Sequence, residues 1–539
     1  MKYVTIFHAN LNYAYLTPDR YEFVIRRSYE LIFDTMREDF PGVKFVFEAS
    51  GYTIEQMAER APDVLEKLKA AVADGTCEFM GSPHAHPMLP NFPEEDGVKS
   101  LAFALEAYER HLGVRPVSFW NPECGWRDYV PRQIAAAGYR FFTGDFEAYS
   151  RSLLPDGSPQ RPEIYEAEHT DTVGFYNFGF KYDLPGDERA IHFPFNHVQG
   201  LQPDQLRCFL RSDRIAQYGV RYFMGMDGYT LDGYLERVRR YSAQPGGEPE
   251  GHLVIFADDA EYVGTNGWFR LKYQNKPDNV FEACPDAREK LVGLIGGCLE
   301  TGSFATFADA CSSPTPIEDE LFFDDDSAWH GGRASTWAMT PMAQLLRPWQ
   351  DLVRNKLAGA GLGVETEREA WLHLTHSYNS DGQWPPTLPD APHIIHPFNY
   401  RYCFENLLRA EQLAGGVDRS LLQTDPCTTV ETILGIQQRL VLEKADQRLA
   451  AGSDTRAERA RTLIESSRDT ESIRASGARV LYPAEYATRA DALVEARRLV
   501  DGVLIEKDAE KMGGRDPGCE MRDALISEMN ATDDQRHNR

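Results

Sequence analysis

The sequence has few features that would tie the protein to a membrane, to nucleic acid or to a disulfide scaffold. No apolar run approaches the ~20 residues that span a bilayer, and the first residues lack the long apolar core of a signal peptide. The nine cysteines form no Cys-x-x-Cys pair, so neither a cysteine zinc site nor a disulfide framework is indicated. Basic residues number 57 against 83 acidic ones, and the net charge of -26 argues against nucleic acid and anionic membranes as partners. These absences predict a cytoplasmic protein.

Strand-like and helical segments alternate through residues 3–145. Apolar runs occur at residues 3–7, 43–47, 77–80, 117–120 and 140–144, and helical patterns separate most of them. This alternation is typical of parallel strands with helical crossovers, and a wound barrel gathers the ends of such strands in one mouth. We therefore expect the polar residues at these ends to share one rim: His8, Glu48, His86, Glu123 and Asp145.

At 539 residues the chain is too long for one core, so we expect more than one domain. The pattern weakens after residue 150, where a sixth strand is expected near residues 214–218 and a clearer strand at 252–257. Beyond residue 302 the strand signals nearly vanish and helical segments follow. The sequence thus predicts a barrel domain over residues 1–302, an α-helical domain over residues 303–512 and a polar tail over residues 513–539.

Glu123 and Asp259 are the candidate catalytic pair. Pro122 cannot join a sheet ladder, so the chain turns there and leaves Glu123 at the end of a strand. Asp259 follows the apolar run at residues 252–257 in the same way. Two carboxylates delivered into one mouth fit a glycosidase, in which one attacks the sugar and the other protonates the leaving oxygen. The pair predicts this chemistry without a metal ion or another cofactor.

Several motifs, in this order along the chain, resemble glycoside hydrolase family 57. They are His8 at the first strand end, Glu78 in the third segment, His-Pro-Met-Leu-Pro at 86–90, Trp-Asn-Pro-Glu at 120–123 and Asp-Ala-Glu-Tyr-Val-Gly at 259–264. The resemblance implies an α/β fold, an incomplete (β/α)7 barrel followed by an α-helical domain. It also implies a retaining enzyme acting on α-glucans, of the amylase, 4-α-glucanotransferase or branching type, with a carbohydrate as its partner.

The resemblance assigns roles to individual residues. Glu123 is similar to the family's nucleophile and Asp259 to its general acid/base, while His8 and His86 resemble the residues that hold the sugar. The helical domain would contribute Asp381 and Trp384 to the same pocket. Glu78 is a further candidate for substrate binding because it stands in one of these motifs. Trp120, Trp126 and Trp268 are candidates because sugars stack on indole rings. The first motif reads His-Ala-Asn rather than the usual His-Gln-Pro, so the sugar and its linkage stay open.

Other interpretations of these residues are available. Glu123 could form a structural ion pair with Arg127, and Asp258 could be the acid while Asp259 caps a helix. The histidines could be ordinary rim residues and the tryptophans core residues. Rival functions are a metal-dependent α-mannosidase, a polysaccharide deacetylase or a non-catalytic carbohydrate-binding protein. A zinc mannosidase would need His-x-Asp near the N-terminus, where the third residue is Asn10. The oligomeric state is open.

Overall fold

The structure is a computed structural model that describes residues 1–13, 16, 18–155, 188–226, 228–243, 251–265, 281–311, 316–329, 332–338, 341–383, 397–422 and 441–468, with isolated positions at 438, 492, 496, 499 and 500. The chain divides into two compact units. Unit 1 comprises Met1–Gly267 and Phe281–Thr336, and unit 2 comprises Trp268–Val280 and Trp337–Arg539. Among the described residues, no helix combines the length and the apolar character that a bilayer crossing requires.

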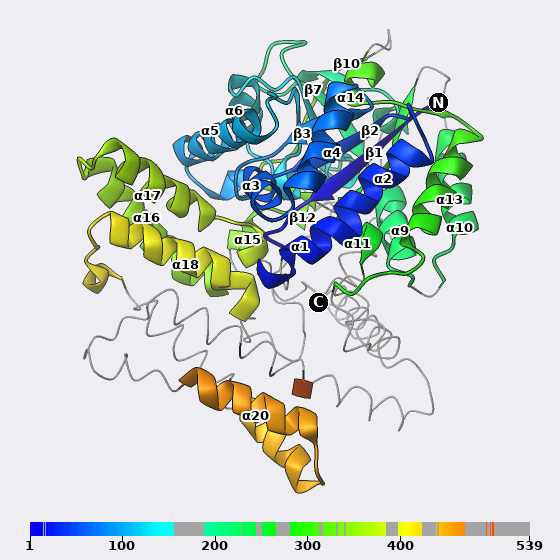
Figure 1. Cartoon of the computed structure of the whole chain (residues 1–539). Coiled ribbons are helices and arrows are strands. Elements are labelled where there is room, and N and C mark those ends of the chain that lie inside the picture. Colours follow the sequence, from blue (N-terminus) through cyan, green and yellow to red (C-terminus); the bar gives the residue numbers. More distant parts are fainter. Residues whose placement is uncertain are drawn as a thin grey trace, which may run out of the picture. The chain divides into compact units, whose positions relative to one another are not determined.

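Unit 1 is built on one large sheet (Figure 1). The strands of this sheet are β1 (Lys2–Ala9), β2 (Phe45–Ala49), β3 (Cys77–Gly81), β4 (Ser118–Phe119), β5 (Phe141–Asp145), β6 (Phe195–Val198), β7 (Arg207–Arg211), β8 (His252–Asp259), β9 (Ser303–Phe304) and β10 (Ile317–Leu321). Their order is β10-β6-β7-β5-β4-β3-β2-β1-β8, with β9 beside the start of β1. From β8 through β1 to β5 and β7 all neighbours are parallel, whereas β6 and β7 are antiparallel. This open, mostly parallel series confirms the prediction of an incomplete barrel.

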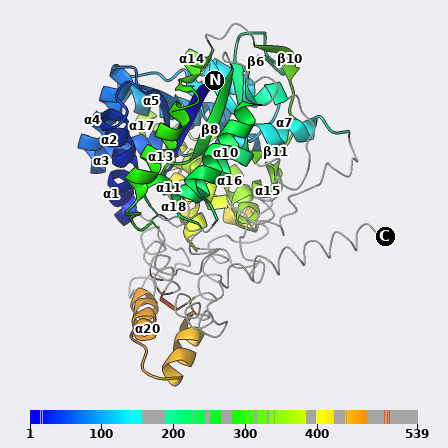
Figure 2. The ribbon, with the colours of Figure 1, turned by 90° about the vertical axis from the view of Figure 1, so that its right-hand side faces the viewer.

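Helices join the strands and cover the outside of the sheet (Figures 1 and 2). They are α1 (Tyr21–Val24), α2 (Glu30–Glu38), α3 (Gly51–Arg60), α4 (Pro62–Ala73), α5 (Glu94–His111), α6 (Val130–Ala136), α7 (Phe146–Ser152), α9 (Asp213–Phe223), α10 (Leu231–Ser242), α11 (Glu261–Gly264), α13 (Ala287–Leu299) and α14 (Phe307–Ala310). Local chemistry sets several boundaries. The Ser50 hydroxyl accepts from the N–H of Thr53 and starts α3, and Pro62 occupies the first turn of α4.

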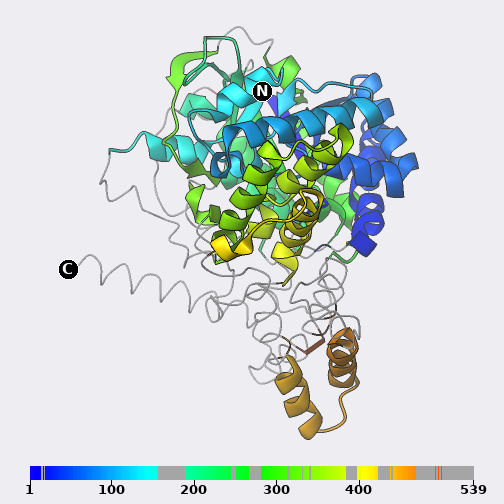
Figure 3. The same cartoon turned by 90° about the vertical axis from the view of Figure 1, so that its left-hand side faces the viewer.

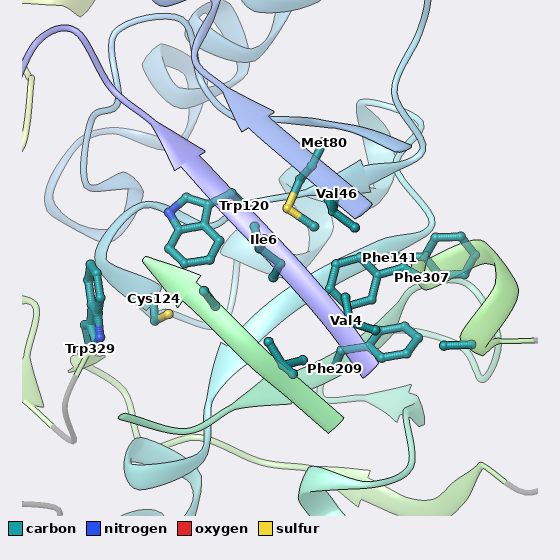
Figure 4. Packing of buried hydrophobic residues seen from close by; sticks show 13 residues of the cluster. Val4, Ile6, Val46, Met80, Trp120, Cys124, Phe141, Phe209, Phe307 and Trp329 are labelled. Atoms are coloured by element: carbon teal, nitrogen blue, oxygen red, sulfur yellow. The ribbon is translucent and has the colours of Figure 1, made fainter. Parts of the chain in front are cut away.

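Apolar side chains fill the inner side of the sheet (Figure 4). The cluster consists of Val4, Ile6, Val46, Met80, Trp120, Cys124, Phe141, Phe209, Val254, Ala257, Phe307, Ala310 and Trp329. Figure 4 shows Phe307 near the beginning of β1, with Trp120 and Trp329 toward its end. Because side chains alternate along a strand, His8 follows Val4 and Ile6 on this inner side. The C-terminal end of the sheet therefore carries polar groups above an apolar interior.

The expected sixth strand near residues 214–218 is wrong, because these residues lie in α9. The Ser212 hydroxyl accepts from the N–H of Arg214 and caps that helix. Ile215, Gly219 and Phe223 are buried and stand four residues apart, which is helical rather than strand spacing. The strands of this region are instead the short β6 and β7.

Unit 1 extends past the expected boundary at residue 302. β9 pairs with Lys2 and Tyr3 of β1, and β10 pairs with β6, so both belong to the main sheet. After them come the short strands β11 (Ser327–Ala328) and β12 (Gly332–Arg333), which pair with each other. The division at Thr336 therefore differs from the sequence-based one. The expected tail over residues 513–539 lies outside the described residues.

Unit 2 is helical in its described part. α15 (Ser335–Ala338) spans the division between the units, and α16 (Pro341–Gly359), α17 (Val364–His376), α18 (Pro397–Leu413) and α20 (Thr455–Arg468) follow. The helices α16, α17 and α18 pack against one another, and Figure 3 shows them in yellow-green to yellow. Their contact is partly polar, since the indole Nε1 of Trp349 donates to Glu411 over 2.6 Å.

Candidate active site

Three neighbouring strands bring His8, Glu48 and Asp259 to the same level. His8 of β1 is in register with Glu48 of β2 on one side and with Asp259 of β8 on the other. Nδ1 of His8 and Oε2 of Glu48 form a hydrogen bond, and Nε2 of His8 lies 4.0 Å from Oδ1 of Asp259. All three side chains are buried. The imidazole thus stands between two carboxyl groups at the C-terminal end of the sheet.

Glu123 follows β4 in a tight turn. Its backbone and that of Cys124 are left-handed, with φ of 53° and 48°, a conformation that costs a non-glycine residue about 1–3 kcal/mol. The side chain of Asn121 donates to the carbonyl of Gly125 over 2.7 Å and closes the turn. Strained backbone of this kind concentrates at functional sites, so the turn itself supports a role for Glu123.

Two neighbouring imidazole rings connect Glu123 with Asp259. Oε1 of Glu123 lies 4.0 Å from Nδ1 of His86, whose backbone is also left-handed. The His86 and His8 rings are 4.9 Å apart between centroids, and the Trp120 ring stacks on His8 at 4.9 Å and 19°. His8 in turn lies beside Asp259. The two predicted catalytic carboxylates therefore belong to one continuous group of contacts.

The two aspartates at the end of β8 face opposite sides of the sheet. Asp259 is in register with His8, whereas Asp258 is in register with Phe7. Oδ2 of Asp258 accepts from the amide Nε2 of Gln217 on α9 over 2.6 Å, and its Oδ1 accepts from the backbone N–H of Asp259 over 2.9 Å. Asp258 is thus tied to a helix outside the sheet, and Asp259 lies on the side of His8.

Burial shapes the protonation of the groups around this rim. It lowers the pKa of His8 to about 3, helped by the positive charge of Arg211, and lowers the pKa of His86 well below its ordinary value. It raises the pKa of Glu48 well above its ordinary value and that of Asp258 to about 7. At neutral pH both imidazoles are therefore uncharged.

A buried arginine compensates a group of carboxylates beside the site. Nη1 of Arg211 lies 3.3 Å from Oδ1 of Asp145 and 2.7 Å from Oδ1 of Asp213. Its guanidinium is 4.9 Å from the centre of the Trp329 ring. Within the described part of the chain, Asp145, Glu147 and Asp213 form the one group of three residues with the spacing of metal ligands. Because Arg211 forms ion pairs with Asp145 and Asp213, its guanidinium already supplies a positive charge to this cluster.

The remaining predicted site residues lie in different places. Trp120 is in the group around His8, but Trp126 packs on Phe323, 4.7 Å between ring centroids, in the manner of a core residue. Met80 of β3 is in register with Glu48, and Glu78 stands two residues earlier in the same strand. The Glu78 carboxylate accepts from the N–H of Ala308 over 3.0 Å. The structure therefore does not bring Glu78 to the rim.

Three further predicted site residues are Asp381 and Trp384, expected from the helical domain, and Trp268. Asp381 is buried in unit 2, where it begins a short 3-10 turn (Asp381–Gln383). Trp268 and Trp384 lie outside the described residues. Their roles in substrate binding stay predictions. Arg127, the alternative partner of Glu123, forms no ion pair within the part of the chain that the structure describes.

Sequence reasoning missed the residues that support this site from behind. Gln217 lies in the segment that was predicted as the sixth strand, Arg211 in a strand that the pattern did not recognise, and Trp329 in the region assigned to the helical domain. The available signal was an arginine followed two residues later by an aspartate, but nothing in the local sequence shows whether such a pair is buried or on the surface. Glu48 was visible as a polar strand end, although its contact with His8 was not.

A mostly parallel α/β sheet with two carboxylates at its C-terminal end, connected through the imidazole rings of His86 and His8, is an arrangement that a glycosidase can use. The sequence model of Glycosyl hydrolase family 57 matches residues 2–276. This chain belongs to glycosyl hydrolase family 57, which confirms the resemblance seen in its motifs.

Curated relatives match over short regions. An alpha-amylase of Pyrococcus abyssi is 24% identical over 146 residues, and a 4-alpha-glucanotransferase of Thermococcus kodakarensis is 26% identical over 146 residues. Each match covers 27% of this chain and 21% of the relative, so the chain spans about a fifth of their length. The activity of the whole protein does not follow from these matches.

Solved structures share the fold. The 4-alpha-glucanotransferase of Thermococcus litoralis superposes with a TM-score of 0.51 at 16% identity, over 76% of this chain and 58% of that one. A family 57 branching enzyme of Thermococcus kodakaraensis gives a TM-score of 0.52 at 12% identity, over 78% and 93% of the two chains. At these identities the likeness shows the fold alone.

Proposed function

We propose that this protein is a retaining α-glycosidase or transglycosidase that acts on α-glucans or α-linked oligosaccharides. The observation that carries the proposal is the continuous contact from Glu123 through His86 and His8 to Asp259 at one end of the sheet. Membership of family 57 and relatives named alpha-amylase and 4-alpha-glucanotransferase support the substrate class.

In the proposed reaction Glu123 attacks the anomeric carbon while Asp259 gives its proton to the departing glycosidic oxygen. The bond from carbon to that oxygen breaks, and a glycosyl ester on Glu123 forms. Water or a sugar hydroxyl then attacks the anomeric carbon, the bond from that carbon to the Glu123 oxygen breaks, and Asp259 takes the proton from the acceptor. Hydrolysis and transfer share the first step, so the product lengths from maltooligosaccharides distinguish them.

Asp259 is the better candidate for the acid than Asp258. Both carboxylate oxygens of Asp258 accept protein hydrogen bonds, from Gln217 and from the Asp259 backbone. A group held in this way on the far side of the strand orients its neighbour but does not reach a sugar beside His8. Asp258 therefore acts as a positioning residue in this proposal.

The test compares Glu123→Ala, Asp259→Asn and the matched control Asp258→Asn. We expect the first two to lower turnover of maltooligosaccharides by about 10³-fold or more, and the control by about tenfold or less. Azide should rescue Glu123→Ala and give a β-glycosyl azide, because a small anion replaces the lost nucleophile. Asp259→Asn should lose less on aryl α-glycosides, whose leaving groups need no proton. Full activity in either variant would remove that residue from the mechanism.

A further inference from the structure

Glu48 has no role in the reaction described above, yet it holds one side of His8. Glu48 and His8 are in register on adjacent parallel strands, and the Glu48 side chain is fully buried. The Trp120 ring covers one face of the imidazole, the His86 ring lies 4.9 Å away, and Asp259 lies beyond Nε2. The ring of His8 is thus fixed, and its partner at Nδ1 decides which nitrogen carries the hydrogen.

We propose that Glu48 is protonated and donates from Oε2 to Nδ1 of His8, so that His8 carries its own hydrogen on Nε2 and presents a donor toward Asp259. This proposal deepens the proposed function, on which its catalytic part rests. Glu48 is a positioning residue in it, because it acts through His8. A sugar hydroxyl beside His8 would accept from Nε2 and remain able to donate to Asp259.

Charge and burial favour this arrangement over an ionised Glu48. Among the described residues, no lysine or arginine nitrogen lies within 4.0 Å of its carboxyl group. Burial, opposed in part by hydrogen bonds with Ser82 and the backbone of Ala9, raises the pKa of Glu48 well above its ordinary value. A buried carboxylate without a cation is costly, so the group keeps its proton.

The other titratable groups around the pair carry charges of both signs. The groups that face it are Asp259 and Glu261 near the end of β8, Tyr29 between α1 and α2, Tyr108 on α5, Tyr139 before β5, His86 after β3 and Arg211 on β7. Burial disfavours a negative charge on Glu48, and burial together with the positive charge of Arg211 disfavours a positive charge on His8. Glu48 and His8 are therefore both neutral, and the carboxyl hydrogen of Glu48 lies in the hydrogen bond between them.

The structural test measures the tautomer of His8 in the full-length protein by ¹⁵N NMR with labelled histidine. His8→Gln assigns the signal, because the His8 resonance disappears in that variant. We expect a neutral ring with its hydrogen on Nε2 at pH 7. A hydrogen on Nδ1, or hydrogens on both nitrogens, would overturn the proposal. This readout needs no turnover, so it decides the role of Glu48 even if the proposed glycosidase activity is not found.

The catalytic test compares Glu48→Gln with Glu48→Met. The glutamine amide donates to Nδ1 as a protonated carboxyl does, whereas methionine fills similar space without a strong donor. We expect kcat/KM of Glu48→Gln to stay within about tenfold of the wild type and that of Glu48→Met to fall about 100-fold. The loss of activity at high pH that comes from ionisation of Glu48 should be absent in Glu48→Gln. If Glu48→Gln is as impaired as Glu48→Met while both keep the wild-type fold by circular dichroism, Glu48 acts as an anion and the proposal fails.

Discussion

Glu261 couples the stability of unit 1 to pH. Its Oε1 accepts hydrogen bonds from the N–H of Asn10, over 2.8 Å, and from the hydroxyl of Tyr29. Burial raises the pKa of this carboxyl to about 8, although these hydrogen bonds oppose the shift. The folded state therefore binds a proton that the unfolded chain releases near pH 4.5. Its stabilising contribution is complete below that pH and is lost as the pH rises toward 8.

Glu261→Gln should flatten the decline in stability between pH 5 and 9. The glutamine oxygen accepts the same two hydrogen bonds but does not titrate, so a loss on the order of a few kcal/mol should disappear. Asp258, with a pKa of about 7, contributes in the same direction, so the flattening should be partial. Urea unfolding across this pH range measures it. The exposed control Glu66→Gln should leave the slope unchanged, and an unchanged slope in Glu261→Gln would contradict the assignment.

At the level of residues, the sequence predicts the rim better than its surroundings. His8, Glu123 and Asp259 could be found because each follows an apolar run, and parallel strands place their C-terminal ends at the same edge of the sheet. Glu78 stood in a matching motif, but its position in the strand points it to Ala308 at the other end of the sheet. Contacts such as that of Arg211 with Asp213 and Trp329 depend on the folded chain and carry no local pattern.

At the level of elements, the contact of α11 with the π-helical turn Ile25–Tyr29 depends on a glycine. A Cβ on Gly264 would lie 1.9 Å from the carbonyl oxygen of Arg27 and 2.8 Å from Cα of Ser28. The N–H of Gly264 also donates to the hydroxyl of Ser28 over 3.1 Å. Backbone is in contact with backbone here, so neither side can move without displacing its element.

Gly264→Ala should destabilise the protein by ~3 kcal/mol because the added methyl group has no space. Gly296→Ala is the matched control in α13, where the new Cβ would meet its first neighbour, Cζ of Phe40, at 4.0 Å. That change should stabilise the helix by about 0.5–1 kcal/mol. Thermal unfolding of the two variants checks both signs. Equal effects would show that the packing of α11 is loose.

The success of the element predictions follows the length of each element. The helices α3, α4 and α5 show several turns of periodic apolar residues, and their breaks at Ser50 and Pro62 have local causes. α9 follows a strand directly and contains Tyr, Val and Ile, so a short window reads as a strand. β9 has two residues, which is too short for any period, whereas the equally short β4 was predicted because Pro122 marks the end of its apolar run.

At the level of the whole molecule, unit 1 is discontinuous in sequence. Residues after 302 complete its sheet through β9 and β10, and α14 places Phe307 in the interior, 4.5 Å from Phe209 of β7 between ring centroids. A boundary drawn where strand patterns stop must miss such segments, because their strands are short and their helix has one turn. The change of composition after residue 302 marks the end of the regular pattern rather than the end of the core.

Phe307→Ala tests this arrangement in the full-length chain. If residues after 302 complete the core of unit 1, the lost ring should cost about 3–5 kcal/mol and reduce hydrogen-exchange protection in β1 and β7. Phe322→Ala is the matched control in the same region, since its side chain is 40% exposed and its loss should cost less than ~1 kcal/mol. If these residues instead belonged to a separate helical domain, Phe307→Ala would leave β1 and β7 as protected as in the wild type. That outcome would restore the division at residue 302.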